Sequence, residues 1–317
     1  MNLIDKQNSL VIDVTYRCNA KCHYCKWGNQ ETPGRVNQSK KSVFISKETL
    51  RHLNTQRIVL SGGEPLLHKN LEEIISYYQQ SGVESILIIT NGLVLSMERL
   101  TNLVSSGLTG VVFSIDSFEQ KTAHATRAYN AKQLKKIKQN FISACNLKKE
   151  SKFEIGINIV ISTENISNRH LEKFIEFTNN YPLDWIKFQP IFDDGYVGSN
   201  APHLLLNSLH AELIRITGNN ILDIIKTESN PISFWESLAE VLDGNKLKGK
   251  SCGLDTRQAV AQNGQIKICS WIDYPSYDIT KQSIQETQKE FAKVKSQCKT
   301  ETFCYCLQNL SHKWETE

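Results

Sequence analysis

The stretch "LVIDVTYRCNAKCHYC", residues 10–25, joins a short apolar run to three closely spaced cysteines. The run is rich in β-branched residues, which predicts a buried strand. Cys18, Cys22 and Cys25 follow it, with no fourth cysteine nearby. A closed tetrahedral zinc site needs four ligands and a disulfide needs two, so a group of three indicates a different chemistry.

Three thiolates in a C-x3-C-x2-C pattern can ligate three irons of a 4Fe–4S cluster and leave the fourth iron open to an outside ligand. A cluster with an open iron is a reaction centre. The alternatives are a zinc site completed by His23 or by a distant residue, and a spacing that arises by coincidence.

Composition indicates an ordinary globular protein. The chain has 317 residues, of which 40% are hydrophobic and 22% charged, and its net charge is +4. Its basic residues are scattered in short clusters such as 132–139, typical of a solvated helix face, so we expect no nucleic-acid partner. The N-terminus carries Asp5 where a secretory signal would be apolar, and no later stretch has the length of a membrane span. We therefore expect a cytoplasmic protein without a membrane partner, whose nine cysteines are metal ligands or buried thiols.

Short β-rich runs alternate with segments of helical period from residue 9 to about 190, which predicts repeated βα units around a parallel sheet. Helix N-caps are expected at Ser46, Asn70, Ser96 and Ser167. The predicted strands are 10–14, 57–60, 85–89, 110–115, 153–161 and 184–189, and the predicted helices are 46–53, 70–81, 96–106, 131–148 and 167–180.

Six such units predict an α/β fold, a partial (β/α)6 TIM-type barrel, with functional residues at the C-terminal ends of the strands. We expect a core at 1–200, a helical connector at 201–248 with helices near 205–228 and 231–243, and a small cysteine-bearing domain at 249–317.

The second strand leads into "VLSGGEPLL", residues 59–67. Gly62 and Gly63 lack side chains where a ligand would approach the backbone, and Glu64 offers a carboxylate that can hold an ammonium group. The alternative is a glycine turn before a helix.

Together these motifs, with aromatic Tyr24 before the last cysteine and Pro65 after the carboxylate, resemble the radical S-adenosylmethionine (SAM) enzymes over residues 9–190. The resemblance implies that SAM chelates the open iron and is cleaved, after reduction by a donor such as flavodoxin or ferredoxin, to a 5′-deoxyadenosyl radical that takes a hydrogen atom from substrate. It makes Cys18, Cys22 and Cys25 the ligands of the SAM-binding 4Fe–4S cluster. It also implies cofactor contacts from Tyr24, Gly62, Gly63, Glu64, Pro65, Thr90, Asn91, Ser114, Asp116, Arg127 and Asn158.

Several of these residues have plainer alternatives. Thr90, Asn91, Ser114 and Asp116 could equally be helix caps or turn residues, and Arg127 a surface arginine.

The remaining cysteines gather in the tail. Alternation around Asn263-Gly264 predicts a β-hairpin, and a helix is expected at about 281–296. A hairpin and helix bounded by cysteines resemble the SPASM and twitch extensions, which bind an auxiliary 4Fe–4S cluster. The back half departs from the SPASM pattern, because Lys295 stands where a cysteine would be needed. The resemblance implies ligands among Cys252, Cys269, Cys298, Cys304 and Cys306, and the alternative is a structural zinc ribbon.

The substrate is expected to be a small natural product such as an amino sugar or aminocyclitol, oxidised or epimerised, with a ribosomally made peptide as the alternative. A non-catalytic iron–sulfur or zinc protein is the alternative from another class.

Cys145 is expected to be a buried thiol, or else a hydrogen-atom donor. Polar and aromatic residues expected near the mouth of the barrel are Asp193, Asp194, Tyr196, Trp271 and Asp273, which are otherwise solvated loop residues.

Overall fold

The fold is taken from a computed structural model. It describes residues 9–25, 43–148, 152–167, 169–191 and 201–245, and the backbone of three strands at 258–262, 265–267 and 277–278. None of the helices in these ranges has the length and apolar character needed to cross a membrane.

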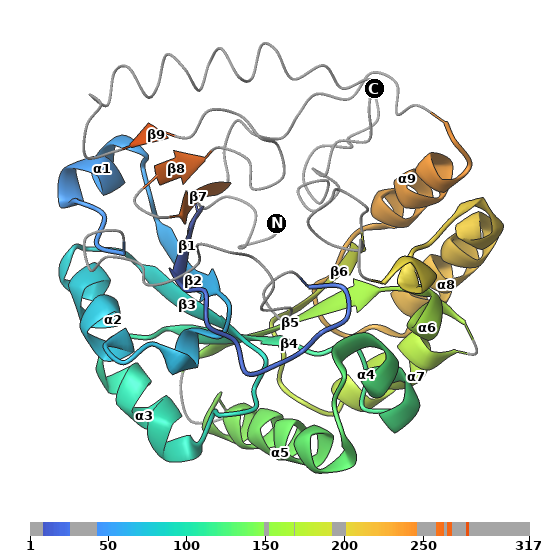
Figure 1. The fold of residues 1–317 in the computed structure, drawn as a ribbon, viewed down its shortest axis with the longest axis horizontal. Coiled ribbons are helices and arrows are strands. Elements are labelled where there is room, and N and C mark those ends of the chain that lie inside the picture. Colours follow the sequence, from blue (N-terminus) through green and yellow to red (C-terminus); the bar gives the residue numbers. More distant parts are fainter. Residues whose placement is uncertain are drawn as a thin grey trace.

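Six parallel strands form an arc, and the helices cover its outer side (Figure 1). The strands pair in sequence order, each with the next, as right-handed βα units require. This arrangement confirms the predicted partial barrel. The strands are β1 (Ser9–Thr15), β2 (Arg57–Gly62), β3 (Ser85–Thr90), β4 (Gly110–Ser114), β5 (Glu154–Ile161) and β6 (Trp185–Pro190).

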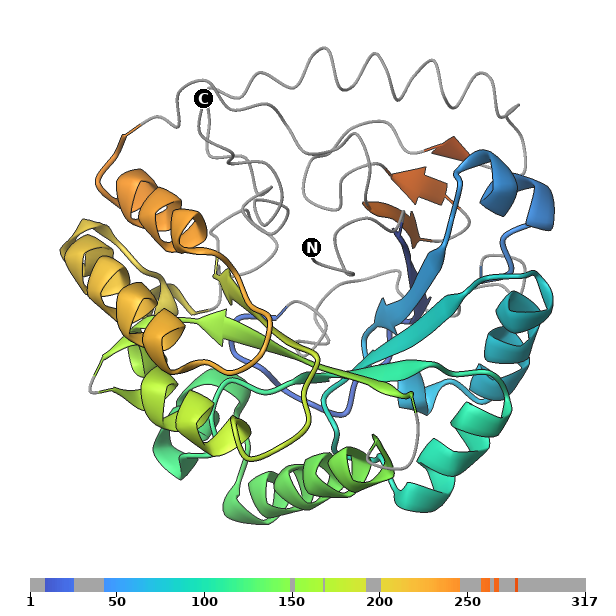
Figure 2. The same cartoon turned by 180° about the vertical axis from the view of Figure 1, so that it is seen from behind.

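The helices include all five that were predicted in the core, and Figure 2 shows the same outer layer from behind. Helix α4 was missed: it has only eight residues, and residues 128–130 separate it from the longer α5. The helices are α1 (Lys47–His52), α2 (Leu71–Gln80), α3 (Met97–Ser105), α4 (Gln120–Arg127), α5 (Ala131–Lys148), α6 (Thr163–Ile166), α7 (His170–Thr178), α8 (Ala211–Ile224) and α9 (Ile232–Leu242), with 3-10 turns η3 (Pro65–Leu67), η4 (Pro202–Leu204) and η5 (Ser208–His210).

Two of the four predicted N-caps are confirmed by side-chain hydrogen bonds. Ser46 accepts from the Thr49 amide and Ser96 from the Arg99 amide. Asn70 occupies the N-cap of α2 without such a bond. The prediction for Ser167 was wrong: it ends α6, and α7 starts after Arg169, whose backbone is left-handed. The predicted helix at 167–180 thus contains α7 but begins three residues early, and the short α6 was not predicted.

The first helix of the connector is shorter than predicted, because 3-10 turns occupy the first part of the connector and α8 begins only at Ala211. The predicted hairpin is confirmed: β7 (Gln258–Gln262) and β8 (Gln265–Lys267) are antiparallel, and β9 (Tyr277–Asp278) follows. The hairpin also continues the barrel sheet, since β7 pairs in parallel with β1. Isolated hairpin alternation cannot reveal that pairing, because it depends on a strand more than 240 residues away.

The core lies between the sheet and the helices. Alternate residues of β1, Leu10, Ile12 and Val14, are almost fully buried in it, and the same cluster holds Cys145 of α5. The residues between them, such as Asp13, point to the opposite, inner face of the arc. Polar side chains at the C-terminal ends of the strands can therefore meet inside the barrel.

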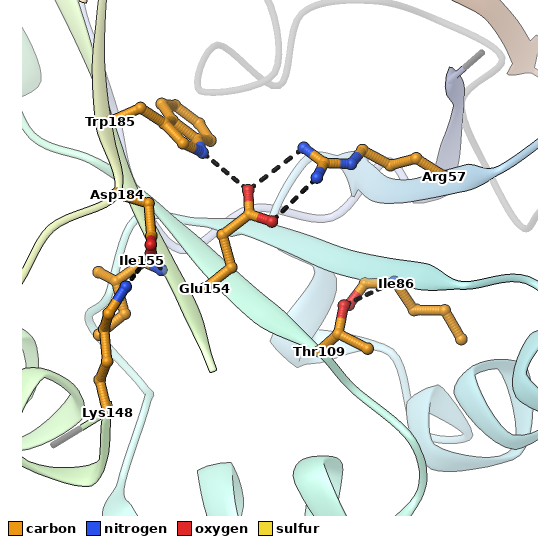
Figure 3. A network of polar contacts seen from close by, with 8 residues as sticks. All are labelled: Arg57, Ile86, Thr109, Lys148, Glu154, Ile155, Asp184 and Trp185. Atoms are coloured by element: carbon orange, nitrogen blue, oxygen red, sulfur yellow. Dashed lines mark hydrogen bonds and ion pairs between the residues drawn. The ribbon is translucent and has the colours of Figure 1, made fainter. Parts of the chain in front are cut away.

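Polar contacts join β2, β5 and β6 at the N-terminal end of the sheet (Figure 3). Both terminal nitrogens of Arg57 donate to the Glu154 carboxylate, at 3.2 and 2.9 Å, and the Trp185 indole donates to it at 2.7 Å. The Trp185 ring fills the space that a side chain at Gly156 would need. This end of the barrel is therefore packed around Trp185, although Arg57 Nε has no hydrogen-bond partner among the described residues.

Candidate functional site

The three cysteines lie on the loop that leaves β1, as predicted. The Cys25 amide donates to the Cys22 carbonyl at 3.1 Å, and the Ala20 amide donates to the Cys18 sulfur at 3.4 Å. The His23 amide donates to the Thr126 carbonyl in α4 at 3.0 Å, which ties the loop to the far side of the barrel. Cys22 is buried, whereas Cys18 and Cys25 are half-buried.

The glycine pair after β2 packs against this loop. The Gly63 amide donates to the Thr15 carbonyl at 2.7 Å, and the Glu64 amide donates to the Arg17 carbonyl at 2.8 Å. A β-carbon on either glycine would collide with these same carbonyls, and Gly62 has a φ of 114°. The chain's own backbone therefore occupies the space that sequence analysis reserved for a ligand, and the glycines bring Glu64 beside the cysteine loop.

Glu64 is a buried carboxylate held by three donors. Its Oε1 accepts from the Thr90 hydroxyl at 2.8 Å and the Leu66 amide at 3.1 Å, and its Oε2 accepts from the Asn91 amide at 2.8 Å. Burial raises the pKa of Glu64 to about 7, and these hydrogen bonds oppose the shift. Oε2 accepts a single hydrogen bond, so it keeps the capacity to accept another.

The Asn91 side chain extends from Glu64 to the cysteine loop. Its Nδ2 donates to the Asn19 side chain at 2.8 Å and approaches the Cys18 sulfur at 3.9 Å. The structure thus brings together Thr90, Asn91, Glu64 and Cys18, which sequence analysis placed after three different strands.

A buried ion pair lies against the cysteine loop at Cys22. Arg127 donates from Nε and Nη2 to the two oxygens of Asp116, both at 2.7 Å, and both side chains are buried. Asp116 also accepts from the Tyr24 hydroxyl at 2.8 Å and the Val160 amide at 2.9 Å. The surface alternative for Arg127 is therefore wrong.

Arg127 also connects this pair to a cysteine. Its Nη1 lies 3.9 Å from the Cys22 sulfur, and its guanidinium carbon lies 5.5 Å from the centre of the Tyr24 ring. Burial raises the pKa of the Cys22 thiol to about 12, against the opposing charge of Arg127. Nitrogen donors from the end of β3 and from the end of helix α4 thus approach two of the three sulfurs.

The donor set fits an iron–sulfur cluster. Three sulfurs come from one loop, and N–H groups of Ala20, Asn91 and Arg127 approach them, the kind of contact that tunes such clusters. Across the described ranges, no three His, Cys, Asp or Glu side chains converge as ligands of a single metal ion.

Ser114 and Asn158 face each other as neighbours on β4 and β5, both half-buried. Pro65 begins the 3-10 turn that Glu64 caps. Cys145 is fully buried in the core outside the sheet, the environment of a buried thiol. The other candidates lie outside the described residues: Asp193, Asp194, Tyr196, Trp271, Asp273, Cys252, Cys269, Cys298, Cys304 and Cys306.

Tyr129, two residues after Arg127, is a buried polar residue that sequence reasoning missed. It is 3% exposed, and its hydroxyl has no hydrogen-bond partner among the residues that the structure describes. Ala128, in left-handed conformation, turns the chain between Arg127 and Tyr129. An aromatic residue two positions after Arg127 was the available signal, but neither periodicity nor spacing marks it as buried.

Known proteins resemble this chain in sequence and in fold. Residues 12–178 match the family model of the radical SAM superfamily. A GTP 3′,8-cyclase of Syntrophomonas wolfei is 32% identical over 196 residues, which cover 59% of this chain and 56% of the cyclase. The match thus spans little more than half of that relative's length.

Two solved structures share the fold. Streptococcus suis SuiB bound to the precursor peptide SuiA aligns with a TM-score of 0.66 and 13% identity, over 92% of this chain and 67% of SuiB. The structure of anSMEcpe with bound AdoMet aligns with a TM-score of 0.64 and 18% identity, over 96% of this chain and 95% of that chain. The family match covers more than half of the sequence, from β1 to the end of α7. The chain therefore belongs to the radical SAM superfamily.

Proposed function

We propose that the chain is an enzyme that cleaves SAM reductively and uses the resulting radical to take a hydrogen atom from a small-molecule substrate. The observation that carries the proposal is the junction of three thiols with the Glu64 carboxylate at the C-terminal end of the sheet, connected through Asn91. Buried carboxylates without a charged partner are costly, so a site that keeps one is suited to a cationic ligand.

Cys18, Cys22 and Cys25 would hold a 4Fe–4S cluster. When bound, the cluster supplies one electron to SAM, which yields methionine and the 5′-deoxyadenosyl radical. The residues around it keep two of the sulfurs surrounded by N–H donors, from Arg127 on one side and Asn91 on the other. These donors favour the reduced, more negative state of the cluster.

Glu64 Oε2 accepts one hydrogen bond in the protein and would accept a second from the ammonium group of SAM. The ammonium charge would favour the ionised carboxylate and lower the raised pKa of Glu64. Thr90 and the Asn91 amide fix the carboxylate in place, so little rotamer freedom is lost on binding.

Tyr24, Ser114 and Asn158 would border the adenosyl part of SAM, and Asp116 would hold Tyr24 and Arg127 in position. The Asp116 carboxylate accepts four hydrogen bonds, which fixes the positions of both side chains. The role of Arg127 is thus proposed to be electrostatic support of the cysteine loop.

For the substrate we propose GTP as the first compound to test, because the curated relative with 32% identity is named a GTP 3′,8-cyclase. The amino sugar expected from the tail gains no support from that relative. Peptides are tested in the same way, because a small molecule and a peptide would each lose a hydrogen atom to the same radical.

The proposal is tested by incubating anaerobically reconstituted, reduced protein with SAM and measuring 5′-deoxyadenosine and methionine. We expect both products in equal amounts from the wild type, and none from Cys22→Ser. Cys145→Ser is the matched control, because that thiol is buried outside the sheet, and it should retain cleavage. An intact cluster that yields no 5′-deoxyadenosine would refute the proposal.

Substrate is then identified by hydrogen transfer. Deuterated GTP, amino sugars or peptides are added in turn, and deuterium in 5′-deoxyadenosine identifies the substrate. Iron content tests the auxiliary cluster: about eight irons per chain support a second 4Fe–4S cluster on the tail cysteines, and about four exclude it.

A further inference from the structure

Tyr129 carries a buried hydroxyl that the proposed chemistry does not use. Its side chain is 3% exposed, yet its oxygen has no hydrogen-bond partner within the described part of the chain. Buried hydroxyls are nearly always paired, so an unpaired one calls for an explanation. A bound group that brings its own acceptor would supply the missing partner.

The surroundings of Tyr129 point to the cysteine loop. Tyr129 follows Arg127 across the left-handed turn at Ala128, and Arg127 reaches the Cys22 sulfur. The same segment meets the loop through the bond between the His23 amide and the Thr126 carbonyl. The chain segment that carries Tyr129 is therefore in direct contact with the loop that holds Cys22.

The neighbouring carboxylate cannot serve as the acceptor. Both oxygens of Asp116 already accept two hydrogen bonds each, from Arg127, Tyr24 and the Val160 amide. A fifth donor would have to displace one of them. The cluster would bring sulfur acceptors into this space, and SAM would bring oxygen acceptors; the test below separates the two.

We infer that the Tyr129 hydroxyl donates a hydrogen bond to a sulfur of the cluster held by Cys18, Cys22 and Cys25. The inference rests on the proposed function. It makes Tyr129 a positioning residue that sets the reduction potential, because a donor to sulfur stabilises the reduced, more negative cluster. Arg127 and Asn91 provide N–H donors to the loop's sulfurs, and Tyr129 adds an O–H donor.

The test is Tyr129→Phe, which removes the oxygen and keeps the buried ring. Wild type and variant are reconstituted anaerobically, matched for iron and sulfide, and titrated by electron paramagnetic resonance. We expect a more negative midpoint potential in the variant, shifted by up to about 59 mV. For a one-electron reduction, this shift corresponds to a tenfold change in the equilibrium constant. Tyr77→Phe is the control, because its hydroxyl donates to the Ile45 carbonyl at 2.7 Å in the helical layer. It should leave the potential unchanged.

A second readout detects the hydrogen bond itself. Electron–nuclear double resonance of the reduced cluster should show an exchangeable proton that is lost in deuterated buffer and absent in Tyr129→Phe. Equal potentials and proton couplings in wild type and variant would overturn the inference, as would a loss of SAM affinity at unchanged potential. Failure of the wild type to bind a cluster at all would instead refute the proposed function.

Discussion

The two ends of the parallel sheet each contain a buried arginine paired with a carboxylate, but the pairs differ in what surrounds them. At the N-terminal end, the Glu154 carboxylate that pairs with Arg57 also accepts from the Trp185 indole (Figure 3). At the C-terminal end, the pair of Arg127 and Asp116 contacts the Cys22 sulfur. Arg57 keeps an unpaired Nε among the described residues, so the two pairs differ in their surroundings: the C-terminal pair borders the cysteine loop, and the N-terminal pair packs against an aromatic ring.

The largest effect on stability is expected from Asp116→Ala. The change leaves Arg127 buried without a counter-charge and removes the acceptor of Tyr24, which should lower the free energy of unfolding by about 3–5 kcal/mol. Urea unfolding of the protein without cofactors measures this value. Because Arg127 also supports the cysteine loop, the variant should retain less iron than the wild type. A variant that keeps all of its iron would contradict the proposed role of this end of the sheet in holding the cluster.

Glu154→Ala breaks the matching pair at the other end. We expect a smaller loss, about 2–3 kcal/mol, because the Glu154 side chain is 21% exposed whereas that of Asp116 is 0% exposed. Iron content and SAM affinity of the folded variant should equal those of the wild type. A change in SAM affinity, measured by equilibrium dialysis, would contradict the division of roles between the two ends.

Glu64→Gln tests the ligand side of the comparison. Loss of one charge-assisted hydrogen bond should weaken SAM binding by about 1.5–3 kcal/mol, or roughly tenfold to a hundredfold. Wild-type affinity should rise as the pH increases through 7 and Glu64 ionises, whereas that of the variant should lose this dependence. Affinity measured between pH 6 and 8 decides the matter.

The same carboxylate predicts an opposite effect on stability without ligand. Because the pKa of Glu64 is raised in the folded state from 4.5 to about 7, its stabilising contribution is full below pH 4.5 and is lost as the pH rises through 7. At pH 8 the ligand-free Glu64→Gln protein should therefore unfold at a higher urea concentration than the wild type. Equal midpoints would mean that the burial of Glu64 costs nothing.

The smallest effect is expected from Ser96→Ala, which lies at neither end pair. It removes the N-cap of α3, where the serine oxygen accepts from the Arg99 amide at 3.1 Å, and should cost about 1 kcal/mol. Unchanged SAM cleavage per folded molecule, measured by 5′-deoxyadenosine formation, is the expected result. A large loss of activity per folded molecule would show that a change in stability alone lowers turnover. The effects of the other variants could then not be assigned to one end of the sheet.

Local patterns were sufficient to predict the strands and the motif residues that follow them. Cys18, Glu64 and Asn91 each come after a strand, and the parallel sheet brings them together at one edge. The partners of these residues could not be predicted, because they depend on contacts between distant strands. Nothing near Asp116 in the sequence indicates its pairing with Tyr24, 92 positions away, and nothing near Gly63 indicates that its missing side chain faces the Arg17 carbonyl.

The central claim is that the cysteine loop holds a cluster whose open iron binds SAM beside Glu64. The most direct measurement is the electron paramagnetic resonance spectrum of the reduced, reconstituted protein with and without SAM. We predict that saturating SAM changes the signal of the cluster in the wild type and that Glu64→Gln needs a higher SAM concentration for the same change. A reduced cluster whose signal is identical with and without SAM would contradict the account.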